Sequence, residues 1–173
     1  PYLYRPTPHL KHSHYPSALK HLVLLGAGHA HLFVLQALAK HHPADLNVTL
    51  VTPHTRQLYS GMAPGFVAGH YNLDDCVVPL GPLVAASRVK LVQSTAVQMN
   101  AEHRAVLLAD GTELHYDVLS IDTGSVLDPA RVDAMMPGAR ENGLFVRPIE
   151  GFGALWPQVE VLAQNRALSL AVI

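Results

Sequence analysis

Cysteine is nearly absent from this sequence, since Cys76 is the single cysteine among 173 residues. One thiol excludes a disulfide framework, a zinc site built on cysteines and a C-x-x-C redox pair within this chain. We interpret Cys76 as a small buried hydrophobe, with a redox role as the alternative. H-E-x-x-H and other zinc spacings are also lacking, although the chain has 12 histidines, so we expect no specific metal site.

Charge of either sign is scarce, because only 14% of the residues are charged and 12 Lys and Arg face 13 Asp and Glu. This balance leaves no basic field for nucleic acid or for an anionic membrane. No apolar run reaches the ~18 residues of a transmembrane segment. The hydrophobic share of 49% therefore predicts a packed domain, with some apolar surface that another part covers.

The clearest positive pattern is a strand, a glycine turn, a helix and a second strand. Leu22–Leu25 is a short apolar run typical of a buried parallel strand. The glycine turn 26–28 follows, then a helical period over 29–42 that Pro43 ends, and then the β-branched run 46–51. This order predicts a βαβ unit.

The glycine turn matches part of the dinucleotide-binding pattern G-x-G-x-x-G. Gly26 allows the tight turn, and Gly28 allows the backbone to approach a pyrophosphate at the start of the helix. His31 stands at the third glycine position, so we expect the helix to sit slightly off the sheet or the side chain to point elsewhere. Thr52 replaces the acidic residue that would bind the adenosine ribose, which counts against NAD. Dinucleotide binding is favoured over a purely structural turn.

The remainder predicts an α/β fold in which a small antiparallel β-meander sits on the parallel βαβ core. We expect a loop with a short helical turn over 53–72, an interrupted helix over 74–87 and an irregular segment over 131–147. Short strands are expected over 89–92, 96–99, 105–108 and 116–121, with a hairpin turn at Asp110-Gly111. Residues 148–165 predict a helix in their second half.

Four segments together resemble a known family: residues 26–31, 58–65, 68–71 and 116–125. They are similar to motifs of the pyridine nucleotide-disulfide oxidoreductase superfamily. The most similar branch includes type II NADH dehydrogenases and the flavoprotein part of proteins fused to selenide, water dikinase. Asp122 stands where the last motif usually has alanine. The resemblance covers residues 21–173. The four motifs together are specific for this superfamily, although no single motif is.

The resemblance implies a Rossmann-like FAD-binding domain and a division of the chain into three parts. Residues 1–20, which the resemblance does not cover, are predicted from their proline-rich composition to form an extended or disordered arm. Residues 21–166 would form the N-terminal part of the FAD-binding domain. The apolar run 167–173 would be the first strand of an NAD(P)H-binding domain, so we expect the sequence to be a piece of a longer chain.

The family's FAD contacts carry over to five groups of residues. They are the glycine turn and helix start at the pyrophosphate (Gly26, Ala27, Gly28, His29, Ala30), the adenosine ribose side (Thr52, Pro53, Arg56), the flavin side (Tyr59, Ser60, Gly61, Met62), the adenine side (Ala96, Val97) and the pyrophosphate or ribityl chain (Thr123, Gly124). A solvated loop position is the alternative for Arg56, and core packing is the alternative for Met62. No residue is predicted to be catalytic.

The resemblance implies hydride transfer from NAD(P)H to FAD, followed by reduction of a small-molecule acceptor, with a quinone as one candidate. The flavin supplies that chemistry and the protein supplies position and electrostatics. We expect this segment by itself to be inactive. A non-catalytic nucleotide-binding module is the alternative function. The implied location is the cytoplasm, with peripheral attachment to the inner membrane face left open.

Overall fold

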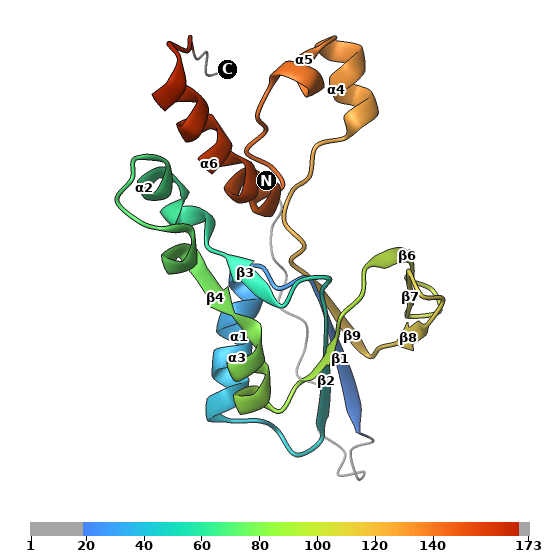
Figure 1. Cartoon of the computed structure of the whole chain (residues 1–173). Coiled ribbons are helices and arrows are strands. Elements are labelled where there is room, and N and C mark those ends of the chain that lie inside the picture. Colours follow the sequence, from blue (N-terminus) through green and yellow to red (C-terminus); the bar gives the residue numbers. More distant parts are fainter. Residues whose placement is uncertain (1–18, 170–173) are drawn as a thin grey trace, which may run out of the picture.

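A four-stranded parallel sheet forms the centre of the computed structural model, which describes residues 19–169 (Figure 1). Its strands are β1 (Lys20–Leu25), β2 (Leu46–Val51), β5 (Lys90–Val92) and β9 (Val118–Ile121). They lie in the order β5-β2-β1-β9, and each neighbouring pair is parallel. The predicted α/β fold is confirmed.

One face of the sheet is covered by helices α1 (His29–Lys40) and α3 (Leu80–Ser87) (Figure 1). The apolar residues that recur at helical spacing in α1 meet the sheet, and Leu35 packs with Leu24 and Leu50 in a fully buried cluster. Leu80 joins them from α3. This cluster fixes α1, and with it the glycine turn, against β1.

The other face is covered by an antiparallel meander of β6 (Ala96–Asn100), β7 (Ala105–Leu108) and β8 (Glu113–His115). Successive side chains of a strand point to opposite faces. Val23 and Leu25 therefore leave the helical face and pack against Val106 and Leu108 of β7. The meander is confirmed, with the turn at Asp110-Gly111 between β7 and β8. Strand β8 was not predicted, and the strands predicted over 89–92 and 116–121 belong to the parallel sheet as β5 and β9.

The chain between β2 and α3 is more regular than the sequence predicted. It contains β3 (Arg56–Leu58), the 3₁₀ turns η1 (Ser60–Met62) and η2 (Leu73–Cys76), helix α2 (Ala63–Val67) and β4 (Val77–Pro79). The expectation of one interrupted helix over 74–87 is wrong, because residues 77–79 pair antiparallel with β3. The two paired segments, 56–58 and 77–79, are far apart in the sequence. Local periodicity therefore does not reveal that they pair.

The C-terminal part holds α4 (Pro129–Met135), α5 (Ala139–Asn142) and α6 (Ile149–Asn165). The irregular segment expected over 131–147 is wrong, because Asp128 caps α4 by accepting hydrogen bonds from the amides of Ala130 and Arg131. Helix α6 also includes the half that the sequence did not predict. Ile149 and Phe152 in that half are buried against Leu58, Phe66 and Cys76, so tertiary packing extends the helix.

The predicted domain boundaries fall largely at the edges of the described range. Of the arm 1–20, only residues 19 and 20 are described, and Lys20 already begins β1. Of the expected strand 167–173, residues 167–169 have no regular structure and the rest lies outside the described residues. The division into domains stays a prediction. No helix within 19–169 has both the length and the apolar character needed to cross a membrane.

Candidate functional site

A cavity of about 400 Å³ opens where β1, β2 and β9 end. Its wall includes the glycine turn after β1, Thr52 after β2, and Thr123 and Gly124 after β9. Within the sheet, β2 lies next to β1 on one side and β9 lies next to β1 on the other side. The strand order therefore reverses direction at β1. Such a switch point, at the carboxyl ends of parallel strands, is where open α/β sheets bind ligands.

Gly26 makes the turn from β1 into the cavity wall. Its φ of +83° lies in the left-handed region that favours glycine. A Cβ at this position would also collide with the carbonyl oxygen of Asp122. The Gly26 amide donates to the carbonyl oxygen of Val51 at 2.8 Å, so the turn is tied to β2 and β9 together.

Helix α1 starts at the cavity with backbone donors that are free. Gly28 is its N-cap residue and supplies no side-chain acceptor. Within residues 19–169, no group accepts a hydrogen bond from the amides of Ala27, His29 or Ala30. These amides and the positive end of the helix dipole form a site that suits an anion such as a phosphate.

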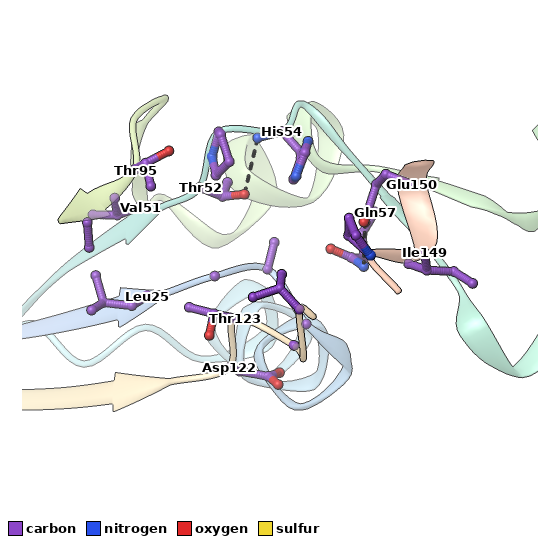
Figure 2. A pocket seen from close by; sticks show the side chains of 18 of the residues that line it. Leu25, Val51, Thr52, His54, Gln57, Thr95, Asp122, Thr123, Ile149 and Glu150 are labelled. Carbon is purple, nitrogen blue, oxygen red and sulfur yellow. Dashed lines mark hydrogen bonds between the residues drawn. The ribbon is translucent and has the colours of Figure 1, made fainter. Parts of the chain in front are cut away.

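The Asp122 side chain lies against this helix start. Its carboxylate Oδ2 accepts from the backbone amide of His31 at 3.2 Å, and its carbonyl oxygen accepts from the amide of Gly28 at 3.1 Å. A Cβ on Gly28 would collide with the Asp122 carboxylate. Figure 2 shows Asp122 and Thr123 at the floor of the cavity, across from Thr52 and His54.

The His31 side chain fills the space that the third glycine of the pattern would leave open. It is 1% exposed and lies between α1 and β9. Nδ1 is 2.6 Å from the carbonyl oxygen of Gly26, and Nε2 is 2.9 Å from Ser120 Oγ. A carbonyl oxygen only accepts, so Nδ1 donates to Gly26. The ring therefore braces the glycine turn against the sheet.

The end of β2 forms the wall predicted for the adenosine ribose. Thr52 lines the cavity but is 2% exposed. Its Oγ1 accepts from the amide of His54 at 3.2 Å, the dashed line in Figure 2. The hydroxyl hydrogen of Thr52 is still available to donate, whereas an acidic residue would only accept.

The structure brings half of the predicted contact residues to this cavity. Those that line it are Gly26, Ala27, Gly28, Thr52, Pro53, Ala96, Thr123 and Gly124. Those outside its lining are His29, Ala30, Arg56, Tyr59, Ser60, Gly61, Met62 and Val97. His29 and Ala30 nevertheless belong to the helix start that faces it. For all of these residues, contact with FAD stays a prediction.

The residues predicted for the flavin side have other neighbours. The rings of His29 and Tyr59 are in contact with centroids 4.5 Å apart and planes inclined at 60°, and Tyr59 covers Gly61. Met62 packs on the cluster around Phe66. Arg56 forms an exposed ion pair with Asp74 at 3.8 Å and lines a second, smaller cavity, so both alternatives for this arginine remain open.

Sequence reasoning missed the far wall of the cavity. That wall includes Gln57, Arg147, Ile149 and Glu150, and Gln57 Nε2 donates to Glu150 Oε1 at 3.4 Å (Figure 2). Residues 147–150 reach the cavity because the start of α6 packs on the β3–β4 region, and no local motif marks that contact. Asp122 could have been found, since it directly follows the strand predicted over 116–121.

Neither a metal centre nor a reactive thiol is found among residues 19–169. No group of three or more His, Cys, Asp or Glu side chains in that range could hold a metal ion. Burial, aided by the nearby Asp75 charge, raises the pKa of the Cys76 thiol above its ordinary value. A raised pKa keeps the thiol protonated and weakly nucleophilic, which supports the interpretation of Cys76 as a packing residue.

Comparisons with known proteins give a consistent result. No profile of a known protein family matches the chain. The sulfide-quinone reductase of Aquifex aeolicus (strain VF5) is 29% identical over 111 residues, which are 62% of this chain and 25% of the reductase. The chain thus spans about a quarter of that curated relative.

Two solved structures share the fold. The sulfide:quinone oxidoreductase from Aquifex aeolicus superposes with a TM-score of 0.69 at 23% identity, over 84% of this chain and 33% of that one. NDH2 from Plasmodium falciparum in complex with NADH gives 0.66 at 15% identity, over 88% of this chain and 31% of that one. The predicted resemblance is confirmed: the chain shares its Rossmann-like fold with these two oxidoreductases and is similar in sequence to part of a sulfide-quinone reductase.

Proposed function

We propose that this chain binds FAD and forms the FAD-binding portion of an NAD(P)H-dependent flavoprotein oxidoreductase. The observation that carries the proposal is the cavity at the switch point between β1 and β9. There the glycine turn, with Gly28 as the N-cap of α1, and the Thr123-Gly124 backbone line one space, and the free amides of His29 and Ala30 follow directly after Gly28. This combination of strand ends, glycines and unpaired donors is the physical requirement for holding a pyrophosphate.

The residues present fit the ADP half of FAD. The free amides of Ala27, His29 and Ala30 would donate to the pyrophosphate, and Gly28 leaves room for the approach of its oxygens. Thr52 and Pro53 would lie beside the ribose, and Ala96 would lie beside the adenine. A cavity of about 400 Å³ matches a part of a dinucleotide rather than the whole.

Positioning is the role of these residues in the proposed reaction. When bound, FAD accepts hydride from NAD(P)H and passes electrons to an acceptor. His31 keeps the Gly26 carbonyl oxygen and Ser120 in fixed places, so the α1 amides point to one position. The buried clusters on both faces of the sheet hold β1 and β9 beside each other. No side chain of the chain need move a proton.

The acceptor and the location belong to the proposal as well. The relative found by sequence is named a sulfide-quinone reductase, which supports a quinone as the acceptor. Relatives of known structure carry NADH in their names, which supports a nicotinamide donor. We infer a cytoplasmic protein, and the quinone acceptor favours peripheral attachment to the inner membrane face.

A charge placed at the helix start tests the FAD site. In the full-length protein, Ala30→Glu adds a carboxylate in the first turn of α1, where Ala30 is exposed. An acidic residue there stabilises the helix, yet it repels a pyrophosphate. We expect FAD affinity, measured by quenching of flavin fluorescence, to fall at least about tenfold with no loss in melting temperature.

The matched control is Gln36→Glu, which adds the same charge on an exposed position of the same helix. We expect this variant to bind FAD as the wild type does. Failure of the wild-type protein to bind FAD, or an equal effect of both variants, would refute the proposed site. Reduction of bound FAD by NADH, seen as loss of its visible absorption, would then separate an oxidoreductase from a non-catalytic nucleotide-binding module.

A further inference from the structure

The Asp122 carboxylate occupies an unexpected place for a negative charge. It accepts from the backbone amide of His31 in the first turn of α1, in the same helix start whose remaining amides are free. It also lies close enough to Gly28 to collide with any Cβ there. A phosphate approaching the turn would therefore meet the amides of α1 and the carboxylate of Asp122 together.

No cation neutralises this carboxylate. Within residues 19–169, no Lys, Arg or His side chain forms an ion pair with Asp122. The charged side chains that line the cavity are Asp122, Glu150 and Arg147. Two carboxylates and one guanidinium give the cavity lining a net negative charge, so only the backbone amides of the helix start and Arg147 on the far wall would attract an anion.

The same residue has a structural role that explains its presence. Gly28 supplies no side-chain cap to α1, and Asp122 supplies one from β9 instead. Its amide donates to the carbonyl oxygen of Leu25 at 2.8 Å, and its carbonyl oxygen accepts from Gly28. One residue thus ties β1, β9 and α1 together at the turn. A capping carboxylate is stabilising at a helix N-terminus.

We propose that Asp122 is an affinity-determining residue of the nucleotide site, one that fixes the glycine turn and at the same time weakens the binding of the anionic pyrophosphate. This inference rests on the proposed FAD site. The two effects have different physical origins, because capping needs only an acceptor oxygen whereas repulsion needs the charge. They can therefore be separated by substitution.

Asp122→Asn keeps an acceptor oxygen for the His31 amide and removes the charge. We expect this variant to bind FAD and ADP about fivefold to tenfold more tightly than wild type at low salt. The gain should shrink as salt is added, because screening weakens the repulsion. Its melting temperature should stay near that of wild type. Asp122→Ala removes the cap too, so its melting temperature should fall.

Glu150→Gln is the matched control, since it removes a carboxylate from the opposite wall of the same cavity. We expect it to change FAD affinity much less than Asp122→Asn does. The inference is overturned if wild type binds FAD and Asp122→Asn binds it no more tightly, or if Glu150→Gln gives an equal gain. If neither wild type nor Asp122→Asn binds FAD or ADP, the proposed function fails together with the inference.

Discussion

Helix α1 starts beside the cavity and ends at the other edge of the helical layer, and a histidine with two hydrogen bonds holds each end. His31 joins the Gly26 carbonyl oxygen to Ser120. His42 follows the helix and joins the carbonyl oxygens of Ser87 and Leu46, at 2.8 and 2.9 Å. Similar rings thus brace two ends of one helix through different partners.

The two histidines differ in whether their hydrogen-bond partners lie at the cavity. Gly26 lines the cavity, and Ser120 lies two residues before Asp122. Neither Ser87 nor Leu46 lines the cavity. Both partners of His42 are backbone carbonyl oxygens, one at the end of α3 and one at the start of β2. We therefore expect His31 to affect both the stability of the fold and ligand binding at the cavity. We expect His42 to affect stability only.

Removal of the His31 ring is the largest expected effect. His31→Ala would leave a cavity between α1 and β9, where the ring is 1% exposed, and would leave the partly buried Gly26 carbonyl oxygen without its donor. We expect the free energy of unfolding to fall by about 2–4 kcal/mol, measured by urea denaturation. FAD affinity should fall by about tenfold or more, equivalent to about 1.4 kcal/mol, because the turn loses its brace.

The milder variant Ser120→Ala separates the two effects. It removes the partner of Nε2 and leaves the bond from Nδ1 to Gly26. We expect a loss of about 1 kcal/mol in unfolding free energy and a smaller loss of FAD affinity than in His31→Ala. FAD binding unchanged in a folded His31→Ala protein would contradict the coupling.

His42→Ala is the corresponding change at the other end of α1. Two backbone carbonyl oxygens lose their donor, and we expect a loss of about 1–3 kcal/mol in unfolding free energy. FAD affinity of the folded protein should equal that of wild type. If His42→Ala weakened FAD binding as much as His31→Ala does, the proposed difference between the two ends of α1 would be wrong.

The smallest effect is expected at Asp117, at the end of β1 away from the cavity. Its carboxylate accepts from the His21 amide at 2.8 Å and from Lys20 Nζ at 3.3 Å. The His21 amide, followed by Lys20, lowers the pKa of Asp117 below its ordinary value. The charged form is thus favoured by folding, and its contribution is complete above the ordinary pKa and lost as the pH falls through the lowered one.

Asp117→Asn tests this sign. We expect the wild type to lose stability in acid more steeply than the variant, below about pH 4, with equal FAD affinity at neutral pH. Thermal melting across an acid pH series measures the difference. Identical acid profiles of the two proteins would show that Asp117 does not contribute.

The histidines show what the sequence can predict and what requires the structure. The chain has 12 histidines, for which the sequence predicts no specific metal site, and three of the described ones bridge two elements. His31 and His42 brace α1, and His21 joins the carbonyl oxygen of His115 to Thr49 Oγ1. Sequence spacing cannot show these partners, because each lies on a different element.

Local chemistry was enough for the first part of the fold. The apolar run before Gly26, the helical spacing after Gly28 and the run 46–51 each match their elements, since these signals lie within a few residues of one another. The strand pair 56–58 with 77–79 and the first half of α6 were missed. Both depend on burial against distant segments, which overrides local propensity.

The sequence by itself therefore determined the βαβ unit, the glycine turn and the class of ligand that such a turn suits, because glycine freedom, strand alternation and helix periodicity are local properties. Tertiary structure alone decided which residues enclose the cavity. It brought the start of α6 to the far wall, turned the His31 ring toward Gly26 and Ser120, and set the Asp122 carboxylate at the first turn of α1. Those contacts join residues about ninety or more positions apart in the chain, and only packing of the whole domain brings them together.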